Sequence, residues 1–353
     1  MKNFLRFLPI FVSPLLGLLA VPHSGWLVIA GPLFTWVIIP LLDQLIGLDK
    51  ENREDGRWAP LMRVLPAAFV PAQLALLSFG LHRLSSMPLG WESLGLAWGL
   101  SIGTAIGILV AHELMHRSGA VEQRLAEVLM ATASYTHFCI EHVHGHHKRV
   151  GTPDDPASAR LGESLYRFLP RSLVGSWASA WGIETTRLAR RGLGPWSWHS
   201  RMVRYLVAQG ALVATLGIWL GPAGVGWFLL QSALAVLLLE NINYVEHYGL
   251  FREKLPSGAY ERVRPEHSWN ASHAASNSMM LSLARHSDHH AFVTRPYSEL
   301  RHWEGAPQLP GGYANMTLLA LLPPLWFRVM NPRVLALRGA TAIPEPDSAS
   351  FGP

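Results

Sequence analysis

Four of the seven residues at 141–147 are histidines, a density that packing alone does not explain. A neutral imidazole is polar, so a buried one requires a hydrogen-bond or metal partner. If the segment is helical, His142 and His146 lie four residues apart on one face. His147 lies about 100° further round, where it can reach the same metal ion or a neighbouring one. His144 points about 160° away from His146 on an ideal helix, so we expect it not to bind metal.

Two other histidine clusters repeat this helical spacing, so the chain has a first histidine box at 112–116, a second at 142–147 and a third at 286–290. His112 and His116 are four residues apart, at the end of an apolar run. His286, His289 and His290 stand at i, i+3 and i+4, positions that share one face of a helix. Three such groups on separate segments predict a metal site rather than scattered core histidines.

Another imidazole ends a second apolar run. His247 shares a predicted helical face with Asn243 and Glu240, four and seven residues before it. An acidic side chain so near the membrane core is costly and usually functional, so Glu240 favours a ligand role for His247 over a membrane-interface anchor. The candidate ligands are therefore His112, His116, His142, His146, His147, His247, His286, His289 and His290.

Nine imidazoles exceed the ordinary coordination number of one ion, so we expect two ions. Imidazole suits zinc, copper, iron and nickel. A nitrogen-rich pair without cysteine or methionine ligands favours redox iron over structural zinc, and copper stays open. Metal-bound histidines commonly donate their second N–H group to a neighbouring acceptor, often a carboxylate. The candidates for that position are Glu113, Glu141, Asp155, Glu240, Asn243 and Asp288, with Glu246 as a further one.

An intramembrane zinc protease is the principal alternative from another class of enzyme. Residues 112–116 match HExxH, in which two histidines bind zinc and the glutamate, here Glu113, acts as the general base. Such a protease needs only one further ligand and would leave six of the nine histidines unused. It is therefore a remote alternative, as is a metal transporter.

Composition places the site in a membrane protein. Of 353 residues, 50% are hydrophobic and only 15% are charged, too apolar for an ordinary soluble enzyme. The single cysteine, Cys139, excludes a disulfide framework and any CxxC-based zinc or iron–sulfur site within the chain. The formal net charge of +5 fits basic loops against an anionic membrane face, and no soluble basic domain suggests nucleic-acid binding.

Apolar runs of roughly spanning length predict six transmembrane helices. They lie near residues 4–21, 26–48, 64–81, 94–116, 205–220 and 226–247. Basic residues before the first run and after the second and fourth place both termini and the long connections in the cytoplasm. We therefore predict an all-α integral membrane protein with one domain at 1–336. Its cytoplasmic, histidine-rich helical cap comprises 117–204 and 248–336, and 337–353 form a disordered tail.

Four motifs extend the histidine pattern: HELMH at 112–116, EHVHGHH at 141–147, NYVEHYG at 243–249 and RHSDHH at 285–290. With them the chain resembles the membrane-bound alkane 1-monooxygenases, part of the integral-membrane desaturase and hydroxylase group, from about Leu41 to Pro332. Two departures occur: Val143 and His144 replace an Asn-Arg pair of the family, and Met115 replaces a glycine.

The resemblance implies a non-haem di-iron hydroxylase of the bacterial cytoplasmic (inner) membrane, with the nine histidines as iron ligands. It would convert medium- to long-chain n-alkanes to 1-alkanols with O₂ and two electrons. The chain has no GxGxxG fingerprint, and we expect no flavin, haem or nucleotide on it. The resemblance implies that rubredoxin, reduced by an NAD(P)H-dependent reductase, supplies the electrons. A hydroxylase or desaturase acting on a fatty acyl chain or a methylarene is the alternative within the group.

An alkane has no polar group, so its binding depends on burial, at about 0.8 kcal/mol for each CH₂ group. A tunnel among the spans would supply that burial. Phe34, Trp36, Phe69, Trp98 and Phe138 are candidates to line it, although aromatic residues in membrane helices mostly face lipid or pack.

Overall fold

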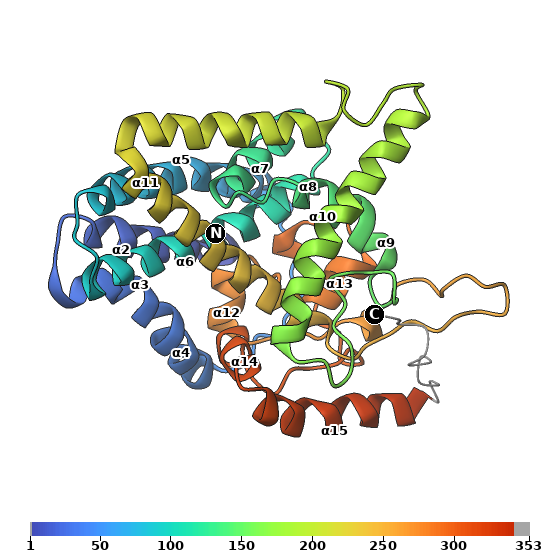
Figure 1. Ribbon diagram of the computed structural model, residues 1–353. Coiled ribbons are helices and arrows are strands. Elements are labelled where there is room, and N and C mark those ends of the chain that lie inside the picture. Colours follow the sequence, from blue (N-terminus) through green and yellow to red (C-terminus); the bar gives the residue numbers. More distant parts are fainter. Residues whose placement is uncertain (1, 342–353) are drawn as a thin grey trace.

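The computed structural model describes residues 2–341, which are helical and contain no β-strand (Figure 1). The predicted all-α architecture is confirmed for these residues. Five segments are long and apolar enough to cross a membrane: Asn3–Ala20, Gly25–Ile46, Gly56–Ser85, Trp91–Met115 and Arg201–His247. This composition fits an integral membrane protein.

Short, irregular helices form the first two of these segments. Asn3–Ala20 covers α1 (Lys2–Leu5), the 3₁₀-helix η1 (Leu8–Phe11) and α2 (Val12–Ala20). Gly25–Ile46 covers η2 (Gly25–Ile29), α3 (Ala30–Leu33), the π-helix η3 (Phe34–Ile38) and α4 (Ile39–Ile46). Both contain prolines, which lack a backbone N–H and interrupt regular α-helical hydrogen bonding.

The next two helices, α5 (Ala59–Ser85) and α6 (Trp91–Met115), pack against each other closely. A Cβ atom on Gly80 would lie 2.5 Å from Leu100 Cδ2, and one on Gly103 would lie 2.5 Å from Leu76 Cδ2. Small residues permit such close approach between membrane helices. The fit holds α6, whose last turn carries the first histidine box, against its neighbour.

The long helix α11 (Arg201–His247) explains why five segments occur where six were expected. A straight helix of its 47 residues would measure about 70 Å, more than twice the thickness of a membrane core. It is broken at Gly221, where φ is +69°, a left-handed value that glycine adopts without steric cost. In Figure 1 the first half crosses the top of the molecule, and after the break the second half turns back and descends diagonally. The expected runs at 205–220 and 226–247 are these two halves.

A chain of buried polar side chains ties α5, α6 and α11 to α7 (Ala120–Thr132). Gln73 Nε2 donates to Thr104 Oγ1 at 2.8 Å, and Thr104 Oγ1 donates to Gln231 Oε1 at 2.7 Å. Gln231 Nε2 then donates to the Thr132 carbonyl at 2.9 Å. Hydrogen bonds between membrane helices fix their relative positions. The chain thereby aligns the two helices, α6 and α11, whose C-terminal ends carry histidines.

The remaining helices gather around the ends of α6 and α11 that carry histidines, from the centre to the right and bottom of Figure 1. They are η4 (Gly56–Trp58), α8 (Phe138–Glu141), the π-helix η5 (His142–His146), α9 (His147–Arg149), α10 (Leu165–Ala189), η6 (Pro265–His267), α12 (Ala274–Met279), α13 (His286–Ala291), η7 (Tyr297–Glu299), α14 (Tyr313–Ala320) and α15 (Pro323–Thr341). Arg285, just before α13, is 2% exposed and donates to the carbonyls of Leu300, Asp49 and Glu51. It connects the third histidine box to the segment after α4.

The predicted disordered tail is only partly within the described residues. Helix α15 continues to Thr341, so residues 337–341 are helical rather than disordered. The rest of that predicted tail, 342–353, lies outside the residues that the structure describes.

Candidate metal centre

The nine predicted histidines lie together as two groups of imidazoles. The first group contains His112, His116, His142, His147 and His289, and the second contains His146, His247, His286 and His290. Within each group, one ring nitrogen from every histidine lies within 4.8 Å of the others. His144 belongs to neither group; it is exposed and lies 3.4 Å from Arg201 Nη1.

Separate helices bring these side chains to one place. The last turn of α6 carries His112, with His116 directly after it, and α11 ends at His247. Two long helices therefore enter the site from the membrane region. The short helices η5, α9 and α13 supply the other six histidines and close over the ends of the long ones.

A π-helical turn decides which histidines of the second box belong together. An α-helical period places His142 and His146 on a common face. In the structure η5 has the i to i+5 pattern of a π-helix, and such turns are frequent at functional sites. His142 therefore faces His147, with their Nε2 atoms 2.9 Å apart, and His146 belongs to the other group.

The spacing of the ring nitrogens fits a metal ion in each group. Nitrogen ligands about 2.1 Å from a common ion lie roughly 3.0–3.4 Å apart at octahedral to tetrahedral angles. In the first group His116 Nε2 is 3.2 Å from both His142 Nε2 and His147 Nε2. In the second group His286 Nε2 is 3.2 Å from His247 Nε2 and 2.9 Å from His290 Nε2.

Burial also prepares the imidazoles as ligands. On the short helices it lowers the pKa values of the following imidazoles well below the usual range, assisted by the neighbouring imidazoles: His142, His147, His286, His289 and His290. These side chains are therefore neutral at neutral pH, and a neutral imidazole offers a lone pair to a metal. Several neutral imidazoles whose lone pairs point at a common centre can bind a metal cation there.

Asp155 is the predicted carboxylate that the structure places directly on a candidate ligand histidine. Its Oδ2 lies 2.9 Å from His146 Nδ1, and the Oγ of Ser158 donates to the same oxygen at 2.7 Å. Burial disfavours charge on both partners, but their attraction outweighs it, raising the pKa of His146 and lowering that of Asp155. The carboxylate fixes which His146 nitrogen faces the second group.

Glu246 occupies a different position, on the ligand side of the second group. Its Oε2 lies 3.2 Å from His286 Nε2, the nitrogen that also faces His247 and His290. Glu246 is 2% exposed, and its carboxylate also hydrogen-bonds to the Tyr313 hydroxyl. Glu246 was predicted only as a further candidate to support a ligand histidine. Its position directly before His247 is the sequence feature that could have identified it.

The other predicted carboxylates face groups other than the histidines. Glu113 pairs with Arg117, and Glu141 accepts from Arg149 and Ser179. Glu240 accepts from Tyr135 and Ser172, and Asp288 accepts from Arg295, Trp303 and the backbone N–H of Arg301. Asn243 faces both Glu240 and the space beside His142. Among the described residues, the hydrogen bonds of these side chains go to groups other than the nine histidines. They join the segments around the centre to one another.

The Glu141–Arg149 ion pair passes so close to Gly145 that we expect any side chain at this position to disrupt it. A Cβ atom there would lie 2.5 Å from Glu141 Oε1 and 2.6 Å from Arg149 Nη2. We expect Gly145→Ala to separate this pair, strand a buried carboxylate and destabilise the protein by about 1–3 kcal/mol. Thermal inactivation of the purified protein measures the loss. Gly182→Ala is the control, since its Cβ would meet nothing within 4 Å, and an equal effect of both changes would contradict the prediction.

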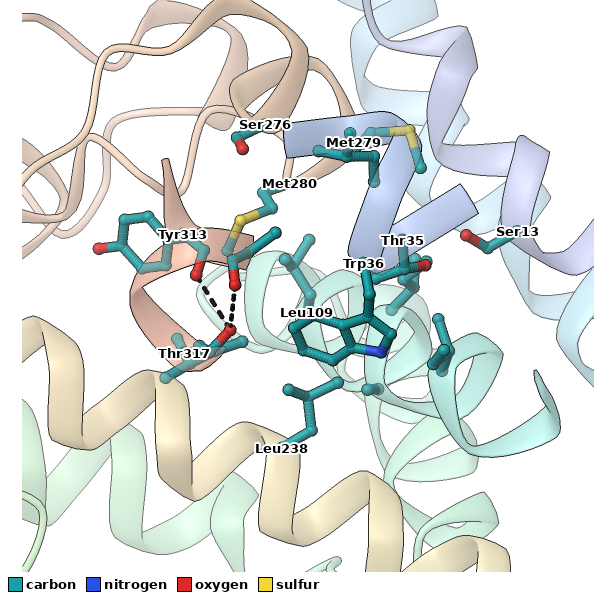
Figure 2. Close-up of a pocket in the computed structure, with 16 residues that line it drawn as sticks. Ser13, Thr35, Trp36, Leu109, Leu238, Ser276, Met279, Met280, Tyr313 and Thr317 are labelled. Carbon is teal, nitrogen blue, oxygen red and sulfur yellow. Dashed lines mark hydrogen bonds between the residues drawn. The ribbon is translucent and has the colours of Figure 1, made fainter. Parts of the chain in front are cut away.

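An apolar pocket leads from the membrane helices to the histidines, and Figure 2 shows its outer part. Its outer cavity, of about 90 Å³, includes Trp36, whose indole lies among the lining side chains in Figure 2. An inner cavity of about 30 Å³ touches His112, His142 and His286. Both cavities are lined by Ala105, Leu109, Ile242 and Met280, so they adjoin. Of the five aromatic candidates, Trp36 and Phe138 line these cavities, whereas Phe34, Phe69 and Trp98 do not. The sequence analysis missed the other lining residues, which are apolar and have no distinctive spacing.

Comparisons with known proteins agree with this site. Residues 89–320 match the family model described as fatty acid desaturase. The chain is 43% identical over 321 residues to alkane 1-monooxygenase 2 of Pseudomonas aeruginosa, covering 88% of this chain and 84% of that protein. It is 43% identical over 313 residues to alkane 1-monooxygenase 2 of Alcanivorax borkumensis, covering 86% of this chain and 81% of that one.

A more distant relative carries a different name. The chain is 31% identical over 336 residues to the xylene/toluene monooxygenase hydroxylase component of Pseudomonas putida, covering 92% of this chain and 87% of that protein. The matched family region contains all nine histidines. The chain therefore belongs to the fatty acid desaturase family and, among its histidine-box oxidoreductases, to the alkane 1-monooxygenases.

Proposed function

We propose that this enzyme hydroxylates the terminal methyl group of medium- to long-chain n-alkanes, using O₂ and two electrons to form 1-alkanols. The observation that carries the proposal is the pocket, which is apolar along its length and ends against His112, His142 and His286. An apolar chain with no polar group can be held there only by burial. Relatives named alkane 1-monooxygenase support this choice of substrate.

Two non-haem iron ions are the proposed metals, one in each group of histidines. Bound iron would supply the activation of O₂ and the insertion of one oxygen atom into the C–H bond. The first group offers five imidazoles, and the second offers four imidazoles and the Glu246 carboxylate. Hard carboxylate and imidazole donors together suit iron. The protein side chains hold the ions, keep the site apolar and orient the substrate methyl group.

Electrons are proposed to come from rubredoxin, reduced by an NAD(P)H-dependent reductase. The single cysteine cannot form an iron–sulfur site within this chain, so the carrier must be a separate redox centre. An acidic carrier would be steered by basic residues on the face that bears the metal centre. Lys148 and Arg301, both exposed, are candidates there.

Six membrane crossings and a cytoplasmic metal centre complete the proposal. The break at Gly221 supports two crossings by α11, because it reverses the helix between two apolar halves. Basic residues flank the end of the membrane helices where the histidines lie, which supports placing that end, and both termini, in the cytoplasm of a bacterium, at its inner membrane.

A related substrate is the second candidate, favoured by the similarity to the xylene/toluene monooxygenase component. A methylarene would give a ring-methyl alcohol, and a fatty acyl substrate would give a hydroxylated or unsaturated chain. The zinc protease is disfavoured, since Glu113 pairs with Arg117 instead of standing free as a general base.

The decisive experiment combines metal analysis with product analysis. Cells that supply rubredoxin and its reductase would express this protein and receive a medium-chain alkane, a long-chain alkane or a methylarene. Iron in the purified protein with 1-alkanol in the culture, and neither product nor full metal content in His289→Ala, supports the proposal. Zinc with no alcohol would overturn it, and iron with only an aromatic alcohol would establish the second candidate.

The pocket predicts that Trp36 limits the length of the alkane. Its indole lies in the outer cavity, so Trp36→Leu should admit additional CH₂ groups, each worth about 0.8 kcal/mol when buried. We expect the ratio of long-chain to medium-chain alcohol to rise several-fold when both alkanes are supplied together. Trp98→Leu is the control, because Trp98 lies on α6 but is 44% exposed and lines neither cavity. A shift of the same size in both variants would refute the assignment.

A further inference from the structure

We propose that a chain of aromatic rings conducts oxidising equivalents from the metal centre to the protein surface when no substrate is bound. The inference rests on the proposed metal-dependent hydroxylation. A centre able to attack a terminal C–H bond must be strongly oxidising, and it will oxidise the protein if the pocket is empty. Tyrosine and tryptophan are among the side chains most easily oxidised, so a chain of them offers a harmless route outward.

The inner part of the chain begins at a candidate metal ligand. The ring of Phe138 stacks on that of His142, with centroids 4.8 Å apart and planes inclined by 28°. Tyr135 follows at 5.9 Å from Phe138, and its ring also meets the edge of His137 at 4.3 Å. Phe138 is not itself oxidised under this proposal; it fills the short gap through which the electron tunnels.

The outer part runs along one side of α10. The ring of His137 lies 4.9 Å from Trp177, Trp177 lies 6.4 Å from Trp181, and Trp181 lies 5.0 Å from Trp196. Trp196 is 73% exposed and ends the chain in solvent. No step between neighbouring rings exceeds 6.4 Å between centroids, so the rings form a continuous route from His142 to the surface.

Tyr135 has the proton acceptor that a redox-active tyrosine requires. Its hydroxyl donates to Glu240 Oε1 at 2.9 Å, and Ser172 donates to Oε2 of the same carboxylate. Asn243 also hydrogen-bonds to Glu240. Donors on both oxygens place this carboxylate as the hydrogen-bond acceptor for the Tyr135 hydroxyl. The network also gives a use to Glu240, a buried acidic residue that does not touch the histidines.

The proposed step balances as follows. Tyr135 gives one electron to the oxidising metal centre through Phe138 and His142, and its phenolic proton passes to Glu240. The tyrosyl radical regains an electron from Trp177 and the proton from Glu240. Trp181 then gives one electron to the oxidised Trp177, and Trp196 gives one electron to the oxidised Trp181. A thiol in solution gives one electron to the oxidised Trp196 and releases its proton to solvent, and two such events join two thiols as a disulfide. The centre is reduced by one electron each time.

The chemistry of the rings sets the direction of the route. Removing an electron from tyrosine or tryptophan requires a strong oxidant, which the working centre supplies and a reducing iron–sulfur carrier does not. The chain therefore conducts oxidising equivalents outward, while the electrons of normal turnover enter elsewhere. The competing explanation is packing or anchoring at the membrane interface, where tryptophan is common.

Trp181→Phe tests the proposal, because it retains a ring of similar shape that is not oxidised. The metal-loaded enzyme would receive O₂, thiol and the electron donor, with or without alkane. With alkane, we expect the wild-type rate of alcohol formation. Without alkane, we expect inactivation several-fold faster than in the wild type. Compared with wild type, mass spectrometry should show less oxidation of Trp196 and more oxidation of side chains near the metal centre. Radical spectroscopy should show a longer-lived Tyr135 radical.

Trp198→Phe is the matched control, since Trp198 is 63% exposed beside Trp196 but has no recorded ring contact with the chain. Trp196→Phe, at an exposed position, repeats the test without risk to folding. Equal inactivation of Trp181→Phe and wild type would show that the rings only pack. Slower alcohol formation with alkane would make the chain an entry route and overturn the proposed direction. Absence of alcohol from the wild type would overturn the proposed function, and this inference with it.

Discussion

Replacing His147 with alanine should abolish alcohol formation, whereas replacing His144 in the same turn should leave it almost unchanged. His147 Nε2 lies 2.9–3.2 Å from the Nε2 atoms of His116, His142 and His289, so its loss opens the first group. His144 is exposed and belongs to neither group. Loss of a direct ligand should exceed the roughly 10–100-fold effect typical of residues that only support a ligand.

Metal content and product formation measure this difference together. We expect His147→Ala to retain less metal than wild type and form no detectable 1-alkanol, and His144→Ala to match wild type in both. His146→Ala should also lose metal, because the π-turn directs it to the second group. Full metal content and activity in His147→Ala would exclude the proposed first site, and a strong defect in His144→Ala would show that the exposed ring acts in turnover.

Helix periodicity predicted which histidines meet but not how they divide. Residues spaced by three or four on an α-helix share a face, and that rule brought His112 to His116 and His286 to His290. For the second box the rule wrongly placed His142 and His146 together, because the extra residue of a π-turn rotates the side chains that follow it. No local sequence pattern in 141–147 predicts such a turn. The pairing was settled by tertiary contacts with α6 and α13.

The sequence also did not predict which of the candidate carboxylates contact a histidine. Asp155 was predicted to support a ligand and contacts His146 directly. Glu113, Glu240 and Asp288 were predicted on the same grounds, and each instead pairs with a side chain that is not one of the nine histidines. A carboxylate beside a histidine box finds whichever donor the fold presents, and in α-helices adjacent residues point about 100° apart. Sequence proximity to a ligand therefore does not determine which partner the carboxylate contacts.

Hydropathy located the membrane helices well and their ends less well. The predicted run at 64–81 lies within α5, which begins five residues earlier and ends four later. Apolar residues identify the buried middle of a span, whereas the polar ends are stabilised by contacts that hydropathy does not contain. The reversal within α11 occurs at Gly221, which is followed by Pro222 and lies between two apolar runs.

Asp155→Asn should weaken metal binding in the second group by about 10–100-fold, the usual effect of removing a carboxylate that supports a ligand histidine. Asparagine keeps a side chain of nearly the same shape but loses the charge that attracts His146 and fixes its ring orientation. Ser158, which donates to Asp155 Oδ2 and accepts from the backbone N–H of Gly151, would also lose its charged acceptor. The effect should therefore reach the loop that holds η5 and α9 in place.

Asp154→Asn is the matched control, because it makes the same chemical change at the neighbouring, exposed position. Titration with a competing chelator measures metal affinity for both variants, and alcohol formation at saturating metal separates weak binding from impaired turnover. We expect Asp155→Asn to release metal at lower chelator concentrations and to regain part of its activity when metal is added. Equal affinities in the two variants would mean that His146 holds its orientation without the carboxylate. The packing of η5 against α8 and α10 would then be what positions it.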